Sequence, residues 1–141
     1  WLAQLTVPGM RERGWGRIVN IASVHGLVAS VNKTAYLAAK HGLVGLSKGV
    51  ALETATDGIT VNCICPGWTD TPIIAPQIEA RAQALGGNRD AAIRDLLREK
   101  QPNQTLLPPG RIGDVAVFLC SDAAAGITGV SLPVDGGWTA Q

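Results

Sequence analysis

Apolar residues occur along the chain in two patterns, short continuous runs and longer stretches with helical periodicity. The short runs are rich in β-branched residues and are typical of strands covered on both faces. They predict strands at residues 17–22, 59–65 and 130–134. The longer stretches predict helices at residues 2–10, 34–53, 72–100 and 112–121.

Glycine and proline residues mark the expected boundaries of these elements. Gly16 is expected to end the opening helix, and Gly86-Gly87-Asn88 is expected to divide 72–100 into two short surface helices. Pro66-Gly67 closes the second strand. Pro108-Pro109-Gly110 predicts a loop before the last helix.

The alternation of strands and helices predicts an α/β fold with a doubly wound parallel sheet. Three strands make a poor independent sheet, because parallel strands need covered faces and neighbours at their edges. We therefore expect residues 1–141 to be the C-terminal half of a single domain whose first half lies upstream. Ligands of such sheets bind at the carboxyl ends of the strands.

Composition and charge argue against several classes of function. The net charge is +1 without a cluster of Lys and Arg, which argues against a nucleic-acid surface. No apolar run reaches the roughly 18 residues of a membrane span, and no leader pattern precedes the first strand, so a cytoplasmic protein is expected. Cys63, Cys65 and Cys120 have neither disulfide nor zinc spacing and predict buried thiols rather than a metal site.

The residues with the clearest chemical pattern are Ser23, Tyr36 and Lys40. Ser23 follows the first strand, and Tyr36 and Lys40 lie one turn apart on the next helix. A free phenol has a pKa of roughly 10, so a tyrosine that acts as a general base needs a nearby cation to favour its phenolate. Two unit charges 4 Å apart interact by about 4 kcal/mol near a protein surface. The pattern predicts a base, a cation that assists it and a hydroxyl that orients the reacting oxygen.

Four motifs together resemble the short-chain dehydrogenase/reductase family over essentially the whole chain: Asn20-Ile21-Ala22-Ser23, Tyr36-x-x-x-Lys40, Asn62-x-x-x-Pro66-Gly67 and Asp135-Gly136-Gly137. The resemblance implies a Rossmann-like fold and hydride transfer with a nicotinamide cofactor. It assigns catalysis to Ser23, Tyr36 and Lys40.

The same resemblance implies where the cofactor binds. Lys40 would hold the ribose hydroxyls beside Tyr36, and the segment after the second strand would contact the nicotinamide. The cofactor residues of that segment are expected to be Pro66, Gly67, Trp68, Thr69 and Thr71. Of these, Thr71 is the best side-chain candidate. The family's Gly-rich diphosphate loop belongs to the first half and is expected upstream.

Gly42, Gly45 and Gly49 lie within a helix pattern and do not follow a strand, so they predict close helix packing rather than a phosphate loop. In the family this helix commonly pairs with the same helix of another subunit. A homotetramer is therefore implied by the resemblance.

A narrower resemblance, in Ala22-Ser23-Val24-His25-Gly26 and Asp135-Gly136-Gly137-Trp138, is to the family's bacterial D-3-hydroxybutyrate dehydrogenases. It implies NAD as the cofactor and a small hydroxy acid or keto acid as the substrate. Besides Ser23 and Tyr36, the substrate-binding residues would be His25, Lys33, Trp68 and Gln77. Trp138 has two interpretations, closing the pocket or packing in the core.

Three hypotheses remain open at this stage. The first is oxidation of (R)-3-hydroxybutyrate to acetoacetate with NAD, and the second is reduction of 3-oxoacyl thioesters, for which Lys33 would have little use. The third is a non-catalytic fragment that lacks the half that binds the dinucleotide. The preference for NAD or NADP is set in the family by a residue of the first half.

Overall fold

The structure, a computed structural model, describes residues 2–140 of the 141-residue chain. Its strands form one parallel sheet in the order β1-β2-β3. The strands are β1 Gly16–Ile21, β2 Ile59–Pro66 and β3 Ser131–Val134. The α-helices are α1 Leu2–Arg13, α2 Thr34–Glu53, α3 Ala75–Ala84, α4 Arg89–Arg98 and α5 Pro109–Cys120. Short 3₁₀ turns are η1 Val24–Gly26, η2 Pro72–Ile74, η3 Asp122–Ala124 and η4 Trp138–Ala140.

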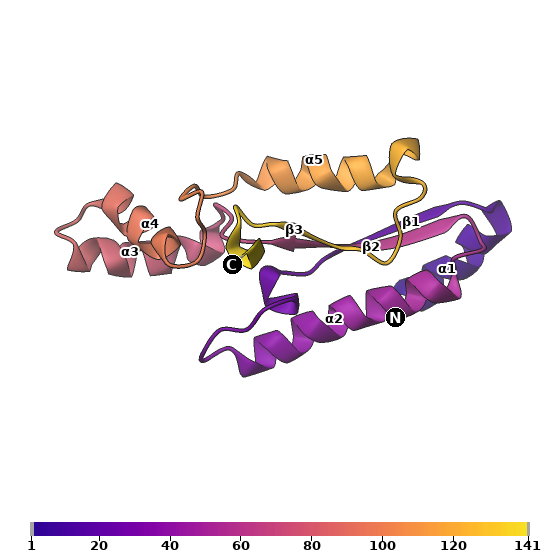
Figure 1. Ribbon diagram of the computed structural model, residues 1–141, viewed down its shortest axis with the longest axis horizontal. Helices are drawn as coiled ribbons and strands as arrows, with labels where there is room; N and C mark the ends of the chain where they lie inside the picture. The colour runs from indigo at the N-terminus through magenta and orange to yellow at the C-terminus, as the bar shows by residue number, and fades with distance from the viewer. Residues whose placement is uncertain (1, 141) are drawn as a thin grey trace.

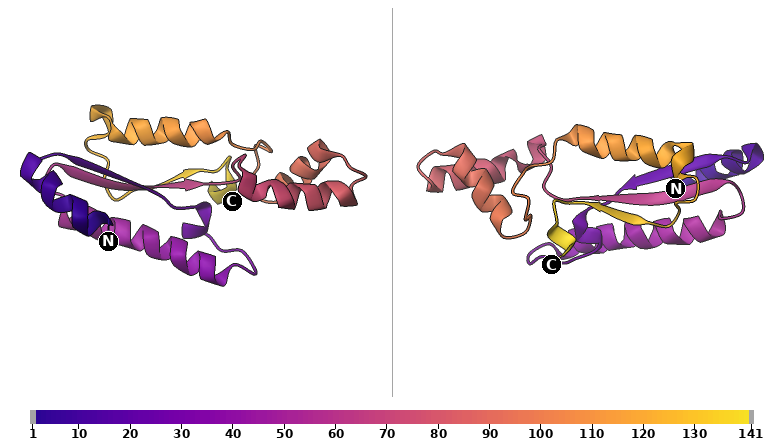
Figure 2. Two further views of the ribbon diagram at one scale, coloured as in Figure 1. Left: turned by 180° about the vertical axis from the view of Figure 1, so that it is seen from behind. Right: turned by 45° about the horizontal axis from the view of Figure 1, so that its top comes forward.

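The helices form three groups around the sheet. Helices α1 and α2 cover one face and α5 covers the other, as Figures 1 and 2 show. Helices α3 and α4 form a pair that extends beyond the carboxyl ends of the strands. This arrangement confirms the predicted α/β fold and leaves the carboxyl ends of β1 and β2 between α2 and the α3–α4 pair.

Strand β2 is the centre of the core. Seven of its eight residues are buried, as expected for a strand with helices on both faces. Cys63 and Cys65 project to one face of β2 and pack there with Ala22 and Val44. The prediction of buried thiols is confirmed for these two cysteines, whereas Cys120 is exposed at the end of α5.

Two predicted boundaries were wrong. Helix α1 ends at Arg13, because Gly14 takes the left-handed conformation with φ of 63° and the Trp15 N–H donates to the Met10 carbonyl over 3.2 Å. Gly16, the predicted break, is instead the first residue of β1. Helix α5 begins at Pro109, inside the predicted loop, since the fixed φ of proline suits the first helical position.

One face of helix α2 and one edge of strand β1 have no packing partner among residues 2–140. Apart from the adjacent residues and the backbone of α2 itself, no described atom lies within 4 Å of a Cβ atom built at Gly42, Gly45 or Gly49, so the predicted close packing of α2 does not occur within residues 2–140. Strand β1 pairs with β2 alone among the described strands, and Ile21 at its end is 48% exposed.

Candidate active site

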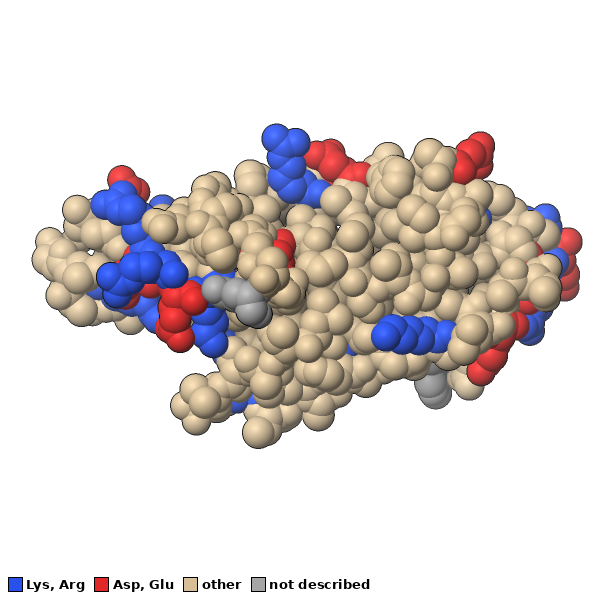
Figure 3. All heavy atoms as spheres, in the orientation of Figure 1, with Lys and Arg blue, Asp and Glu red and all other residues tan. Residues whose placement is uncertain are grey.

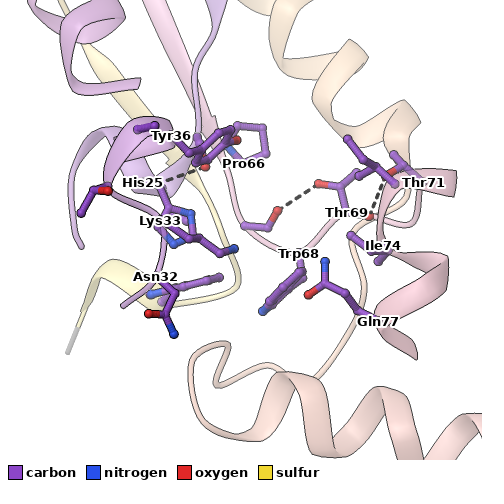
Figure 4. A pocket seen from close by; sticks show the side chains of 17 residues that line it. His25, Asn32, Lys33, Tyr36, Pro66, Trp68, Thr69, Thr71, Ile74 and Gln77 are labelled. Carbon is purple, nitrogen blue, oxygen red and sulfur yellow. Dashed lines mark hydrogen bonds between the residues drawn. The ribbon is translucent and has the colours of Figure 1, made fainter. Parts of the chain in front are cut away.

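Two adjoining cavities lie at the carboxyl ends of β1 and β2. The larger has a volume of about 620 Å³ and the smaller about 430 Å³, and both are lined by Ser23, Tyr36, Pro66 and Gly67. Figure 4 shows the larger cavity, with η1 and α2 residues on one side and the segment after β2 on the other. The position is the one that a doubly wound sheet offers to a ligand.

Ser23 is held in place by the backbone that follows it. It is the N-cap of η1, with extended φ and ψ of −178° and 161°, and its Oγ accepts the His25 N–H over 3.2 Å. The hydroxyl therefore keeps its own proton for donation. Because Ser23 is buried and lines both cavities, this donor faces a ligand rather than bulk water.

Tyr36 and Lys40 come from the first two turns of α2. The Lys40 ammonium lies 5.7 Å from the centre of the Tyr36 ring and donates to the Ile21 carbonyl over 3.1 Å. That hydrogen bond anchors the cation at the end of β1, next to Ser23. Lys40 lines the smaller cavity and Tyr36 lines both. The structure thus brings the three predicted catalytic residues to one place.

The segment Pro66 to Thr71 forms the opposite wall of the site. Pro66, Gly67, Thr69 and Thr71 line both cavities, and Trp68 lines the larger one. The Thr69 hydroxyl donates to the Gly67 carbonyl over 3.2 Å, and the Thr71 hydroxyl donates to the Thr69 carbonyl over 3.4 Å. Their oxygens retain lone pairs toward the cavities. All five predicted cofactor residues of this segment therefore lie at the site.

Gln101 supports this wall, a role that the sequence did not reveal. It is fully buried, its Oε1 accepts the Trp68 N–H over 2.8 Å, and its Nε2 donates to the Thr105 carbonyl. A Cβ atom at Gly67 would lie 2.6 Å from the same Oε1 and 2.9 Å from Asp135 Cα. Gly67 is therefore required because the turn packs directly against its neighbours.

The predicted substrate residues surround the larger cavity. His25, Lys33, Trp68 and Gln77 all line it, and Figure 4 shows Lys33 and Gln77 approaching the Trp68 ring from opposite walls. The Lys33 ammonium lies 5.5 Å from the centre of that ring. No acidic partner of Lys33 is found among residues 2–140, so its charge is available to an anion.

Trp138 belongs to the site and to the core together. It lines the larger cavity, and its ring lies 5.4 Å from His25 and 5.9 Å from Trp68, centre to centre. It is only 7% exposed. The Asp135 carboxylate, which accepts the Thr139 N–H over 2.8 Å, fixes the turn that carries it. Both interpretations of this residue are thus correct.

The surroundings of His25 favour its neutral form. Burial first, and then the positive charges of Lys33 and Lys100, lower the pKa of its imidazole below the ordinary value of 6.5. The Tyr36 ring lies 5.8 Å away, edge to face. A neutral imidazole in this position acts as a hydrogen-bond donor or acceptor. It does not add a third positive charge to those of Lys33 and Lys100.

Comparison with known proteins agrees with this geometry. The family model described as enoyl-(acyl carrier protein) reductase, one of those for short-chain dehydrogenases, matches residues 1–139. The chain belongs to the short-chain dehydrogenase/reductase family. The lysine and hydroxyl groups of the smaller cavity suit the hydroxyl-rich nicotinamide nucleoside that this family binds.

Two similar members of the short-chain dehydrogenase/reductase family are bacterial D-beta-hydroxybutyrate dehydrogenases. The protein from Cupriavidus necator is 53% identical over 138 residues, which cover 98% of this chain and 54% of the relative. The protein from Rhizobium meliloti is 48% identical over 135 residues, 96% of this chain and 52% of the relative. The chain spans about half the length of the curated relatives that it matches.

Solved structures of this family share the fold. L-sorbose reductase from Gluconobacter frateurii, in complex with NADPH and L-sorbose, superposes with a TM-score of 0.91 at 33% identity over 99% of this chain and 53% of its own. Levodione reductase gives a TM-score of 0.84 at 34% identity over 98% of this chain and 52% of its own. Within residues 2–140, no helix combines the length and apolarity that a membrane crossing requires.

Proposed function

We propose that this chain is the C-terminal, catalytic half of an NAD-dependent dehydrogenase that oxidises (R)-3-hydroxybutyrate to acetoacetate. The observation that carries the proposal is the shared position of Ser23, Tyr36 and Lys40 beside a cavity that is also lined by Lys33, which has no acidic partner among residues 2–140. A small hydroxy acid needs both features, a base at its hydroxyl and a cation at its carboxylate. The resemblance to the two hydroxybutyrate dehydrogenases supports the same substrate.

Each residue has a defined task in this reaction. The Ser23 hydroxyl donates to the substrate oxygen, and the Tyr36 oxygen takes the hydroxyl proton as the carbonyl forms. The Lys40 ammonium stabilises the phenolate beside it. A bound NAD would supply the acceptor for the hydride of the breaking C–H bond. Tyr36 and Lys40 would hold the ribose, with Pro66, Gly67, Trp68, Thr69 and Thr71 against the nicotinamide.

Substrate choice is proposed to rest on the larger cavity. Lys33, His25 and Gln77 would replace the water that the carboxylate loses on entry, while Trp68 would pack against the apolar end of the substrate. The alternative substrate, a 3-oxoacyl thioester, has no carboxylate at this position. Lys33 therefore separates the two hypotheses.

The test is an assay of the complete polypeptide with free (R)-3-hydroxybutyrate and with its thioester, each with NAD and with NADP. Tyr36→Phe should reduce kcat about 10²–10⁴-fold, because it removes the proton acceptor. Lys33→Met should raise KM for the free acid and leave the thioester unaffected, and Lys33→Arg should restore part of the binding. Full turnover by Tyr36→Phe would refute a dehydrogenase, and equal loss on both substrates by Lys33→Met would refute the substrate.

We also propose that the complete protein is a cytoplasmic homotetramer in which α2 pairs with its counterpart. In support, Gly42 and Gly45 leave open space on α2, and Leu46 and Leu52 are 52% and 82% exposed. Small residues allow helices to approach closely, and exposed leucines favour burial. The mass of the complete protein in solution tests this assembly.

A further inference from the structure

A chain of hydrogen bonds leads from the larger cavity to the end of α4. His25 Nε2 lies 2.9 Å from Ser30 Oγ, and the same oxygen accepts a hydrogen bond from the Lys100 ammonium over 3.1 Å. Ser30 and Lys100 are half-buried and stand behind the residues that line the cavity. The chain of bonds joins segments 70 residues apart, the loop before α2 and the turn after α4.

The donors and acceptors of this chain determine where the protons lie. Lys100 is a donor only, so Ser30 Oγ is the acceptor in that bond. Among residues 2–140, the Ser30 hydroxyl has only one other hydrogen-bond partner, His25 Nε2. If Nε2 carried the imidazole proton, Ser30 would face two donors and its own proton would lack an acceptor among residues 2–140. The satisfied arrangement has Ser30 donating to an unprotonated Nε2.

This arrangement leaves the proton of neutral His25 on Nδ1. The neutral state agrees with the lowered pKa, which comes from burial and from the charges of Lys33, Lys100 and His41. Within the described part of the chain, His25 forms hydrogen bonds through Nε2 and its backbone N–H and none through Nδ1, and the ring lines the cavity. Nδ1–H is thus the donor that the imidazole has left for a ligand.

We propose that Ser30 and Lys100 are positioning residues that hold His25 as the Nδ1–H tautomer, so that it presents a donor to an anionic substrate. The ligand part of this inference rests on the proposed function. Neither residue touches the substrate. Ser30 and Lys100 affect substrate binding through the orientation and protonation of the His25 ring.

The same turn also holds the opposite wall of the cavity. Gln101, the neighbour of Lys100, accepts the Trp68 N–H, while Lys100 reaches Ser30 on the His25 side. Lys100 and Gln101 therefore tie the two walls to the end of α4. In addition, the Lys100 ammonium lies 5.7 Å from the centre of the Trp138 ring, which limits where its chain can go.

Nitrogen NMR of the complete polypeptide without substrate tests the tautomer directly. His25, assigned by comparison with His25→Gln, should show the Nδ1–H form. Ser30→Ala and Lys100→Met should each raise the population of the Nε2–H form, because the donor to Nε2 is lost or is no longer fixed. An Nε2–H tautomer in the unaltered protein, or no change in either variant, would overturn the proposal.

Kinetics with (R)-3-hydroxybutyrate tests the consequence for binding. Ser30→Ala and Lys100→Met should each raise KM about tenfold with kcat nearly unchanged, as expected when a hydrogen bond to a charged group is lost in ground state and transition state alike. Lys100→Arg should recover most of the affinity, since it keeps a donor. Lys48→Met, which removes one exposed lysine of α2, is the matched control and should leave KM unchanged.

The two measurements separate failure of this inference from failure of the proposed function. If the protein does not turn over 3-hydroxybutyrate, the NMR result still decides the tautomer. If turnover is normal but Ser30→Ala changes neither KM nor the tautomer, the positioning role is wrong and the enzyme assignment stands. Thermal unfolding of each variant shows whether the fold is retained, and Lys100→Arg gives a second reading if Lys100→Met is unstable.

Discussion

His25 shows how the environment of one residue sets its chemistry. It is 5% exposed, lies against the rings of Tyr36 and Trp138, and is subject to the positive charges of Lys33 and Lys100. Burial and the lysine charges disfavour a charged imidazole. In the proposed function, the carboxylate of 3-hydroxybutyrate would therefore meet one cation and one neutral donor. Such a pair binds an anion without adding to the repulsion between the lysines.

This environment predicts how stability depends on pH. Because the pKa of His25 is lowered by folding, the folded protein binds this proton more weakly than the unfolded chain does. The free energy of unfolding should therefore fall as pH decreases below the ordinary histidine pKa of about 6.5, and it should stop falling below the lowered value. Denaturant unfolding of the complete protein between pH 7.5 and pH 5 measures this slope.

The variant His25→Gln tests this assignment, because it removes the titrating imidazole. It should flatten the slope. A slope that persists unchanged in His25→Gln would show that other groups are responsible.

At the scale of elements, glycine has opposite effects on stability at the end and in the middle of a helix. Gly14 ends α1 with φ of 63°, whereas Gly113 lies inside α5 with ordinary helical φ. Apart from the adjacent residues and the backbone of the same helix, no described atom lies within 4 Å of a Cβ atom at either position. Packing is therefore equal, and the backbone conformation alone differs.

The same substitution should thus change stability in opposite directions. Gly14→Ala should lower the free energy of unfolding by about 1 kcal/mol, because alanine is strained at positive φ. Gly113→Ala should raise it by about 0.5–1 kcal/mol, because alanine is the better helix former. Denaturant midpoints of the two variants measure both values, and changes of the same sign would contradict the explanation.

The elements themselves were largely predictable, because each has a local signal. Strand β2 and helix α2 were predicted to within one residue from apolar runs and periodicity, and the Tyr36 to Lys40 spacing indicated the catalytic face. Gln101 and Lys100 have no such signal. They follow a charged surface helix, and their importance comes from contacts 33 and 70 residues away. Only the path of α3 and α4 in three dimensions creates those contacts.

At the scale of the whole molecule, charge and burial are unevenly distributed. The α3–α4 pair carries intermixed charges of both signs, and the centre of the surface is largely uncharged, as Figure 3 shows. Arg81 and Arg98 both lie 3.5 Å from the Asp95 carboxylate. The pair has its own small core around Ile78 and Leu96. It is thus a distinct unit attached to the sheet layers.

The different burial of the three cysteines predicts the order in which their thiols react. Cys63 and Cys65 are fully buried under α2, and burial raises the pKa of the Cys65 thiol, whereas Cys120 is exposed. A thiolate is the reactive form, so Cys120 should be modified quickly in the native state and the other two only after unfolding. Peptide mass spectrometry after brief alkylation measures the order. Rapid modification of Cys65 in the native protein would contradict the fold.

The single-sided pairing of β1 has a practical consequence. Among the described strands only β2 pairs with it, so its other edge offers a row of main-chain donors and acceptors, flanked by the half-exposed Trp15 and Ile21, and Arg17 is its one charged residue. When these 141 residues are made by themselves, that edge is where copies should stack and aggregate. Attempts to crystallise or label the chain will therefore succeed best when a complementary polypeptide shields that edge during synthesis.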